Sequence, residues 1–355
     1  MKKWCFAIAA SVSLLSLAGC GAPGGDTTAS SNKGSDAGIG NSRLQTVLDR
    51  GSLICGVDGG IPGFSFVENG EYSGLDVDTC KAVAAALFDD PTKVEYRDLD
   101  STERFEALKG GEVDMLARNT TWTISRDTSV GMEFAPVTFY DGQGMLVREA
   151  SGITELKDFE GKSVCVETGT TTELNLTDQM RQLGVNFTPQ TFQDADAAYA
   201  AYEAGSCEGM TSDKSQLVAR RSTLTNPDEH VLLEVTMSKE PLGPLTINND
   251  SAWFDTVKWV TYALFQAEEF GLTSANVEAA VNSEDPNIKR FVGAEGTLGS
   301  DMGLPNDFAL RAVKHVGNYG EIYERNLGEG SVFKLPRGLN AQWSEGGLIY
   351  SPPFR

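Results

Sequence analysis

The sequence predicts an α/β protein of two lobes joined by a two-strand hinge, with a ligand cleft between the lobes. Three observations lead to this prediction. About 315 residues follow the N-terminal leader and a low-complexity segment, which is more than one hydrophobic core comfortably holds. Strand-like and helical patterns alternate along the chain, and the alternation starts afresh near residue 163. Two extended segments that contain glycine, 137–147 and 235–246, would let the chain leave one lobe, build the other and return.

The first series of elements alternates strand and helix in the manner of βαβ units. Residues 53–57 form a short apolar run, and the segment 76–88 has apolar residues at helical spacing. The expected elements of this series are a strand at 53–57, a helix at 76–88, a strand at 94–96, a helix at 102–109 and a strand at 113–116. This alternation predicts sheets connected by crossover helices.

The second series repeats this rhythm without close sequence similarity to the first. Its expected elements are strands at 163–167, 187–192, 208–211 and 231–235, and helices at 171–183, 194–204 and 214–220. An amphipathic helix at 253–270 then opens the C-terminal part, 251–355, which would complete the first lobe. The expected division is a signal peptide at 1–19, a flexible tether at 20–41, lobe 1 at 42–139 with 245–355, and lobe 2 at 140–244.

The N-terminus predicts export and a lipid anchor. Two lysines precede an apolar run, 4–17, that is too short to be a permanent membrane-spanning helix. The run ends on Leu-Ala-Gly-Cys20, a lipobox in which cleavage leaves the cysteine at the new N-terminus to carry the lipid. The alternative is an ordinary signal peptide that contains a cysteine. The polar, glycine-rich segment after Cys20 lacks the apolar content to fold, which predicts a tether.

The net charge limits the classes of partner. The formal net charge of −21 repels nucleic acid and anionic lipid headgroups. We therefore expect no nucleic-acid partner, and contact with the membrane only through the lipid anchor.

The cysteine count agrees with an oxidising compartment. Of the six cysteines, Cys5 leaves with the signal peptide and Cys20 is acylated. An even number then remains, which predicts two disulfides among Cys55, Cys80, Cys165 and Cys207. Three connectivities are possible. Cys55 ends one predicted strand and Cys80 lies on the helix that follows. We expect the same relation between Cys165 and Cys207 further along, which favours the local pairs Cys55–Cys80 and Cys165–Cys207.

Metal binding by the same cysteines is the competing interpretation. No C-x-x-C spacing occurs, and the two histidines, His230 and His315, are far from the cysteines in the sequence. We therefore expect no metal and no cofactor.

The first candidate binding segment runs from an apolar strand into polar residues. Residues 114–126 pass from Asp-Met-Leu-Ala into Arg-Asn-Thr-Thr-Trp-Thr-Ile-Ser-Arg126. Hydroxyls and an amide just past the carboxyl end of a strand lie where α/β proteins bind ligands. An arginine there can form a bidentate pair with a carboxylate. The alternative is that Arg126 is a surface residue in a Ser-Arg-Asp turn.

The second lobe offers two more candidates. Residues 164–173 run from a strand through a glycine turn into a helix, where Thr170 and Glu173 fit a capping box. Such a helix start, with free N–H groups and the hydroxyls of Thr170 and Thr171, also suits a carboxylate. A later strand ends at Asp213, which could pair with an ammonium group or simply cap the helix from residue 214. Together these residues describe a clamp for a zwitterion.

Several stretches closely resemble one family of transport proteins. The sequence resembles the solute-binding proteins of polar amino-acid ABC importers, which are the bacterial extracellular solute-binding proteins of family 3, in the general L-amino-acid-binding subgroup. The resemblance covers nearly all of residues 43–355, and the Asn-Thr-Thr-Trp-Thr run is specific to the subgroup. The matching stretches begin at Arg50 (RGSLICGV), Gly74 (GLDVDTC), Gly111 (GEVD), Arg118 (RNTTWTISRD), Gly169 (GTTTELN), Arg337 (RGLN) and Gly346 (GGLIY).

The resemblance implies a fold and a set of ligand contacts. The fold is the two-lobed periplasmic binding protein fold (type II, cluster F-like), in which each lobe is a mixed sheet flanked by helices. It implies that Arg126 binds the α-carboxylate and Asp213 the ammonium group, and it implies the same two disulfides. Many relatives have an aromatic residue where this chain has Ile61, so Phe64 would supply that contact. The ligand-binding set implied in this way is Asp58, Phe64, Arg118, Asn119, Thr121, Arg126, Thr170, Thr171 and Asp213.

Arg118 has two interpretations in this set. It would meet an acidic ligand side chain or form a structural salt bridge.

The resemblance also implies the function. The expected protein is a monomer in the periplasm or cell envelope that captures free L-amino acids, polar and acidic ones included. Closure over the ligand would present it to the permease subunits of an ABC importer. One alternative is a dehydratase-like enzyme on the same scaffold with Glu167 as its acid, although no nucleophile, base and orienting group come together in the sequence. The other is an amino-acid sensor.

Overall fold

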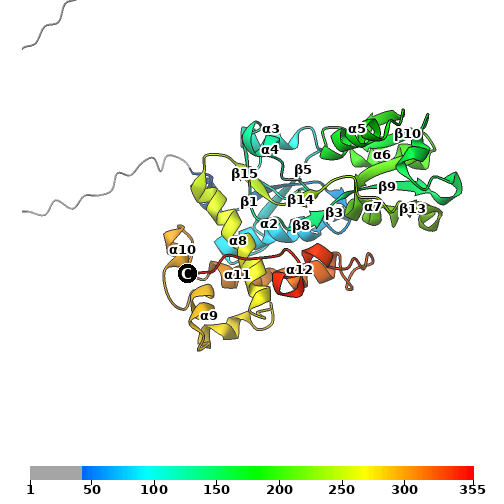
Figure 1. The fold of residues 1–355 in the computed structure, drawn as a ribbon. Helices are drawn as coiled ribbons and strands as arrows, with labels where there is room; N and C mark the ends of the chain where they lie inside the picture. Colours follow the sequence, from blue (N-terminus) through cyan, green and yellow to red (C-terminus); the bar gives the residue numbers. More distant parts are fainter. Residues whose placement is uncertain (1–41) are drawn as a thin grey trace, which may run out of the picture. The chain divides into compact units, whose positions relative to one another are not determined.

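A computed structural model describes residues 42–355 (Figure 1). The predicted signal peptide, the predicted lipidation site Cys20 and the predicted tether lie outside the described residues. Across residues 42–355, no helix combines the length and the apolar character needed to cross a bilayer.

The first lobe is built on a mixed five-stranded sheet. Its strands in spatial order are β5 (Val94–Asp98), β1 (Leu53–Val57), β6 (Met115–Leu116), β15 (Leu245–Ile247) and β7 (Met132–Phe134). β1 runs parallel to β5 and β6, whereas β15 is antiparallel to β6 and β7. A small three-stranded sheet of β2 (Gly60–Ile61), β3 (Ser65–Glu68) and β4 (Glu71–Ser73) adjoins this lobe.

Helices that are largely buried form the core of the first lobe. The central helix α2 (Leu75–Phe88) is buried on nearly every side and packs on α8 (Ser251–Glu269) and α11 (Phe308–Val316) (Figure 1). The indole of Trp253 on α8 is fully buried and donates to the Asp114 carbonyl over 2.7 Å, which joins the C-terminal part to the first sheet. The other helices of this part of the chain are α1 (Arg43–Arg50), α3 (Arg104–Gly110), α4 (Ile124–Thr128), α9 (Pro286–Phe291), α10 (Leu298–Asp301) and α12 (Tyr319–Asn326).

The second lobe repeats the strand directions of the first. Its strands in spatial order are β11 (Thr188–Phe192), β10 (Ser163–Glu167), β12 (Gly209–Asp213), β9 (Gln143–Arg148) and β13 (His230–Leu232). β10 is parallel to β11 and β12, and β9 is antiparallel to β12 and β13. The helices α5 (Thr171–Leu183), α6 (Ala195–Glu203) and α7 (Lys214–Arg221) connect these strands (Figure 1).

The two crossings form the hinge. β8 (Phe139–Asp141) and β14 (Glu240–Leu242) pair in antiparallel fashion, and each then continues into a strand of a large sheet. β9 enters the second sheet and β15 returns to the first, each as the fourth strand in the spatial order. The mixed sheets and the two-strand hinge confirm the predicted fold class.

The C-terminal segment supports the hinge strand β8. The Asn340 side chain accepts from the Tyr140 N–H over 2.6 Å and donates to the Tyr140 carbonyl over 3.2 Å. The hydroxyl of Tyr319 donates to the carbonyl of Thr138 over 2.7 Å. These bonds join the C-terminal part of the chain to β8 and to the residue before it.

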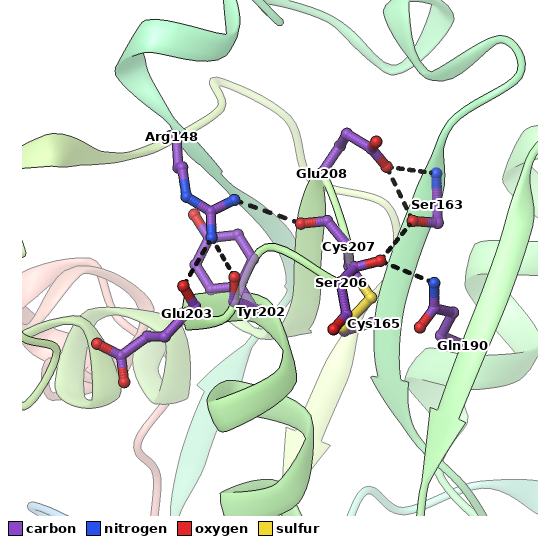
Figure 2. Close-up of a disulfide and its surroundings, with 9 residues drawn as sticks. All are labelled: Arg148, Ser163, Cys165, Gln190, Tyr202, Glu203, Ser206, Cys207 and Glu208. Atoms are coloured by element: carbon purple, nitrogen blue, oxygen red, sulfur yellow. Dashed lines mark hydrogen bonds between the residues drawn. A yellow bond between two sulfur atoms is a disulfide. The ribbon is translucent and has the colours of Figure 1, made fainter.

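The disulfides join Cys55 on β1 to Cys80 on α2, and Cys165 on β10 to Cys207 just after α6, which are the expected pairs. Figure 2 shows the second pair and the arginine that closes the end of α6 beside it. The Arg148 guanidinium donates to the carbonyls of Tyr202, Glu203 and Cys207, and so satisfies carbonyls that a helix end leaves unpaired.

Most predicted elements agree with the structure to within two residues at each end. The strand predicted at 231–235 is wrong at its C-terminal end, because its pairing with β9 stops at Leu232. The chain then turns, and the Val235 N–H donates to the Leu233 carbonyl over 2.8 Å. The two crossings expected as continuous extended segments each divide into two strands, since each must leave the hinge pair to join a large sheet.

Candidate functional site

The candidate site is a small polar cavity between the two lobes. Its volume is about 20 Å³, and its walls come from the ends of β6, β10 and β12 and from the first turns of α3 and α5. This is the position at which open α/β sheets bind ligands. The lining residues are Ser101, Arg104, Arg118, Asn119, Thr121, Arg126, Glu167, Thr170, Thr171, Thr172, Ser212, Asp213 and Gln216.

Arg126 lies in the short helix α4 with its guanidinium directed into the site. The Thr123 hydroxyl caps this helix by accepting from the Arg126 N–H. Arg126 Nη1 donates to the Thr121 carbonyl over 2.8 Å, and the guanidinium lies over the Phe105 ring. Burial lowers the pKa of Arg126 to about 10, partly opposed by Glu240 and Asp213, so the group stays charged at neutral pH. It is buried, not on the surface, and within residues 42–355 no carboxylate lies within 4.0 Å of it.

Asp213 lies across the cavity from Arg126, at the end of β12. It occupies the N-cap position of α7, yet its side chain makes no capping hydrogen bond. Instead, its Oδ2 accepts from Asn119 Nδ2 of the first lobe over 3.3 Å. Burial raises the pKa of Asp213 well above its usual range, and the nearby carboxylates Asp141 and Glu240 raise it further. The capping interpretation therefore accounts for its position but not for its side chain.

Asn119 itself has an uncommon backbone conformation. Its φ of 47° lies in the left-handed region, which asparagine tolerates better than most residues. Its N–H donates to Asp76 on α2 over 3.0 Å, and its buried Oδ1 has no hydrogen-bond partner among residues 42–355. The conformation turns the amide towards the second lobe.

The start of α5 brings two threonines to the cavity. Thr170 caps the helix by accepting from the Glu173 N–H over 3.1 Å. The predicted capping box is not completed, because Glu173 accepts from Gly169, one residue before the cap, over 2.9 Å. Gly169 is left-handed, with a φ of 74°, which redirects that N–H. The Thr171 hydroxyl lies 3.3 Å from the Thr121 hydroxyl of the first lobe.

Glu240 on the hinge strand β14 is a contact that the sequence analysis missed. It is fully buried and accepts from Thr121 over 2.6 Å and from Thr171 over 2.9 Å. It also accepts from Asn175 and Ser238. One carboxylate therefore ties the hinge to both lobes. Its only signal in the sequence is an acidic residue within the extended segment 235–246.

Arg118 is neutralised within the protein. It forms ion pairs with Asp58 at 2.6 Å and with Glu167 of the second lobe at 3.4 Å, and its Nε donates to the Leu99 carbonyl. This geometry is that of a structural salt bridge, the second of its two interpretations. Asp58 lines not the small cavity but a neighbouring one of about 320 Å³, which Arg118 also lines.

The neighbouring cavity is strongly acidic. Besides Asp58 it is lined by Asp98, Asp100, Asp194 and Asp196. Within residues 42–355, no group of three or more His, Cys, Asp or Glu side chains is arranged to hold a metal ion.

Phe64 lies away from the cavity lining. Its ring is buried in the first-lobe core and meets Phe139 edge to face with the centroids 5.1 Å apart. Ile61 is buried in the same core. The carbonyl of Phe64 accepts from the first turn of α2, which holds the residue inward.

Further lining residues had no distinct sequence signal. They are Ser101, Arg104, Thr172, Ser212 and Gln216. Ser101 and Arg104 lie just before and at the start of a helix whose sequence gives no sign that its first turn faces a cavity.

The chain is similar to known binding proteins over most of its length. The family model of the bacterial extracellular solute-binding proteins, family 3, matches residues 53–329. The chain is 50% identical over 315 residues to the general L-amino acid-binding periplasmic protein AapJ of Rhizobium johnstonii, covering 88% of this chain and 92% of that protein. It is 48% identical over 316 residues to the glutamate/glutamine/aspartate/asparagine-binding protein BztA of Rhodobacter capsulatus, covering 88% and 94%.

A solved structure has the same fold over most of this chain. It is an ABC transporter periplasmic binding protein from Brucella ovis with glutathione bound. The TM-score is 0.86 at 49% sequence identity, and the match covers 89% of this chain and all of the other.

Proposed function

Because this chain belongs to the bacterial extracellular solute-binding proteins of family 3, we propose that it captures free L-amino acids and delivers them to an ABC importer. The observation that carries the proposal is the pair formed by Arg126 and Asp213. They line one buried polar cavity from opposite lobes. A cation on one side and an acid on the other match the two charged groups that every free amino acid has.

In this proposal the protein replaces the ligand's hydration at both ends. Arg126 binds the α-carboxylate, with the hydroxyls of Thr121 and Thr171 beside it and the first N–H groups of α5 facing it. Asp213 and the amide of Asn119 bind the ammonium group. The charges of a zwitterion are costly to bury unless each meets opposite charge and hydrogen bonds, which is why both sides of the clamp are needed.

Ligand binding would be coupled to closure about the hinge. The present cavity of about 20 Å³ holds roughly one water molecule, so an amino acid enters only when the lobes separate. Separation breaks the contacts Asn119–Asp213, Thr121–Thr171 and Arg118–Glu167, each of which joins the two lobes. A ligand that bridges the lobes replaces these contacts and stabilises the closed state. The permease would dock on the closed form.

We propose broad selectivity that includes polar and acidic amino acids. The relatives with about half of their residues identical are named for general L-amino acid binding and for binding glutamate, glutamine, aspartate and asparagine. The cavity lining supports this proposal, because it consists almost entirely of hydroxyls, amides and charged groups.

Glutathione is a second candidate, since the similar Brucella structure contains it. Its γ-glutamyl end has the same ammonium and α-carboxylate groups, and the rest of the tripeptide would extend into the neighbouring cavity of about 320 Å³. The aspartates that line that cavity repel the terminal glycine carboxylate. The charge of the site therefore favours a free amino acid over the tripeptide.

The proposal includes the location and organisation of the protein. We propose a monomer in the periplasm, anchored through lipid on Cys20, with lobes at 42–139 with 245–355 and at 140–244. The family is one of solute-binding proteins, so the dehydratase alternative is not retained.

Calorimetric titration of ligand-free, full-length mature protein with each common L-amino acid and with glutathione tests the proposal. We expect several amino acids to bind the wild type, and Arg126→Gln to weaken all of them by about 100-fold, as loss of a charge-assisted contact does. Arg97→Gln is the matched control, because that arginine is exposed and outside the cavity. Absence of amino-acid binding by the wild type, or unchanged binding by Arg126→Gln, would overturn the proposal.

A further inference from the structure

Glu240 on the hinge strand β14 has no role in the proposed clamp, although its carboxylate contacts two residues of the cavity lining. Its side chain is only 1% exposed, and in the described part of the chain it forms no ion pair. Four neutral donors surround it, two on each oxygen. Oε2 accepts from the hydroxyls of Thr121 and Thr171, and Oε1 accepts from the Asn175 amide and the Ser238 hydroxyl. A buried charge that only neutral groups stabilise depends on each of these bonds.

The bonds to Glu240 fix the direction of both threonine hydroxyls. A hydroxyl has one proton and two lone pairs, whereas an ionised carboxylate can only accept. Thr121, at 2.6 Å, and Thr171, at 2.9 Å, therefore each give their single proton to Oε2. Neither hydroxyl keeps a proton for the other, so their separation of 3.3 Å is a contact without a donor. Towards the cavity, which both residues line, each hydroxyl presents lone pairs only.

The two hydroxyls are held in this way only when the lobes are closed. Thr121 belongs to the first lobe, and Thr171 begins α5 in the second. One carboxylate oxygen can accept from both hydroxyls only while they lie close together, as they do here at 3.3 Å. Separation of the lobes breaks at least one bond to Oε2, and the released hydroxyl can then turn its proton elsewhere. Closure about the hinge therefore completes a pair of acceptors.

A further acceptor belongs to the same cavity lining. Asn119 donates from Nδ2 to Asp213 over 3.3 Å, which sets the orientation of its amide. Its buried Oδ1 has no hydrogen-bond partner in the part of the chain that the structure describes. A buried acceptor without a partner is costly, so an orphan of this kind in a binding cavity indicates a ligand group that donates.

Glu240 also acts on Arg126 through space. Burial lowers the pKa of Arg126, and the negative charge of Glu240 opposes this shift. Loss of the charge of Glu240 would leave the positive field of Arg126 less compensated, which favours a ligand carboxylate. Any weakening of amino-acid binding in a neutral variant of Glu240 is therefore expected at the ammonium end of the ligand.

We propose that Glu240 is a positioning residue that holds the hydroxyls of Thr121 and Thr171 as acceptors, so that the closed site takes a ligand group that donates and rejects one that accepts. This inference rests on the proposed function and deepens it, because it gives the site a means to distinguish an amino acid from the 2-oxo acid of the same carbon skeleton. The two molecules share their carboxylates. They differ at C2, where the amino acid has an ammonium group and the oxo acid has a carbonyl oxygen.

The test titrates each amino acid that the wild type binds beside its 2-oxo acid, with L-glutamate and 2-oxoglutarate as the first pair. Calorimetry uses ligand-free, full-length mature protein as wild type, Glu240→Met and the exposed control Glu284→Met. Glu240→Met removes the acceptor and so frees both hydroxyl protons to point into the cavity. We expect its affinity for the amino acid to fall about tenfold and its affinity for the oxo acid to stay or rise. The control should match the wild type.

A second background separates the direction of the hydroxyls from the charge of Glu240. In a protein with Thr121→Val and Thr171→Val no hydroxyl remains to be oriented. Adding Glu240→Met to this background should therefore change amino-acid affinity by less than about threefold. A further tenfold fall would show that the charge acts directly on the ammonium group, and it would overturn the positioning role.

The outcomes separate this inference from the proposed function. If the wild type binds no amino acid, the proposed function fails, and the inference fails with it. If the wild type binds amino acids but Glu240→Met changes amino-acid and oxo-acid affinity by the same factor, or changes neither, the proposed function stands and the positioning role is wrong.

Melting curves show whether the variants of Glu240 and the valine background fold. If either does not fold, Thr121→Ser and Thr121→Val decide. Thr121→Ser keeps the hydroxyl and should keep the wild-type preference for the amino acid over the oxo acid. Thr121→Val should reduce that preference by about tenfold. Equal weakening of both ligands by Thr121→Val would mean that the hydroxyl serves their shared carboxylates, and it would contradict the inference.

Discussion

Asn119 of the first lobe donates from Nδ2 to Asp213 Oδ2 of the second lobe over 3.3 Å, so two proposed ligand contacts hold one another in the closed protein. Asp213 is deeply buried, and its pKa is raised. Its carboxylate faces an amide, although an ammonium group would be a better partner. The bond therefore joins the lobes weakly, and a zwitterion that displaces it gains a charge-assisted contact.

Asp213→Asn should separate binding from stability. Loss of the acid removes the partner of the ammonium group, and we expect every amino acid to bind about 100-fold more weakly by calorimetry. Since the buried carboxylate is unfavourable without ligand, the melting temperature of the unliganded variant should equal or exceed that of the wild type. Asp228→Asn is the control, because that side chain is fully exposed. Unchanged affinity in Asp213→Asn would contradict the ammonium role.

Amino-acid binding should release protons. Burial holds the pKa of Asp213 well above its usual range, and ligand ammonium favours the ionised form, so binding shifts this acid towards deprotonation. Affinity should therefore rise as the pH rises above the ordinary range of an aspartate, and fall again only where the ligand's own amine deprotonates. Calorimetry in buffers of different ionisation enthalpy measures the protons released. Proton uptake across this range would contradict the prediction.

Asp76 should make the unliganded protein less stable as the pH rises. Burial raises its pKa to about 7, with Asp58 adding to the rise, from an ordinary value of 3.8. A raised folded-state pKa contributes stability that is present below the unfolded value and is lost as the pH rises through the folded value. Between about pH 4 and pH 7 this acid therefore lowers the unfolding free energy by up to about 1.4 kcal/mol per pH unit. Urea unfolding of wild type and Asp76→Asn at pH 5 and pH 8 tests this, and a pH dependence that is the same in both proteins would argue against it.

The disulfide of the second lobe should contribute stability without affecting ligand selectivity. It closes a loop of 42 residues, for which the chain-entropy model gives about 4 kcal/mol. The double variant Cys165→Ser with Cys207→Ser should lose about that unfolding free energy. Neither cysteine lines the cavity, so the rank order of amino acids should persist in calorimetry. A reordered rank would show that the disulfide acts on the site.

Asn340→Ala should loosen the hinge. It removes the two hydrogen bonds to Tyr140 on β8, with an expected cost of about 1–2 kcal/mol in unfolding free energy. Small-angle scattering of the unliganded variant should also indicate a larger open fraction. The exposed Asn282 provides the matched control Asn282→Ala. Equal scattering and stability of the two variants would exclude a hinge role.

The sequence predicted the parts of the site that follow local rules. Arg126, Thr171 and Asp213 each come just after a strand or at the start of a helix, and all three line one cavity. Arg104 and Glu240 could not be found in this way. Arg104 looks like any helix-surface arginine until the other lobe covers it, and Glu240 becomes central only because the hinge strand passes the cavity.

The fold, like the site, was predictable where its elements follow local rules. The helical periodicity of α2 and α5, together with the turn residues that flank them, predicted the bounds of both helices to within one residue. The strand predicted at 231–235 extends too far towards the C-terminus. Its end depends on how far its partner β9 extends, and β9 lies 80 or more residues away in the sequence. Phe64 was expected near the ligand, but only packing determines that its ring faces Phe139.

The exchange of strands at the hinge also bears on the order in which the chain acquires structure during synthesis and export. The second sheet is drawn from one uninterrupted stretch, from β9 to β13, and needs no later residue to complete it. The first sheet must wait, because among residues 42–355 β7 pairs only with β15, whose residues Leu245–Ile247 appear after the whole second lobe. Contacts so distant along the chain form slowly. The second lobe should therefore gain hydrogen-exchange protection first in refolding, with the first lobe following as β15 closes it.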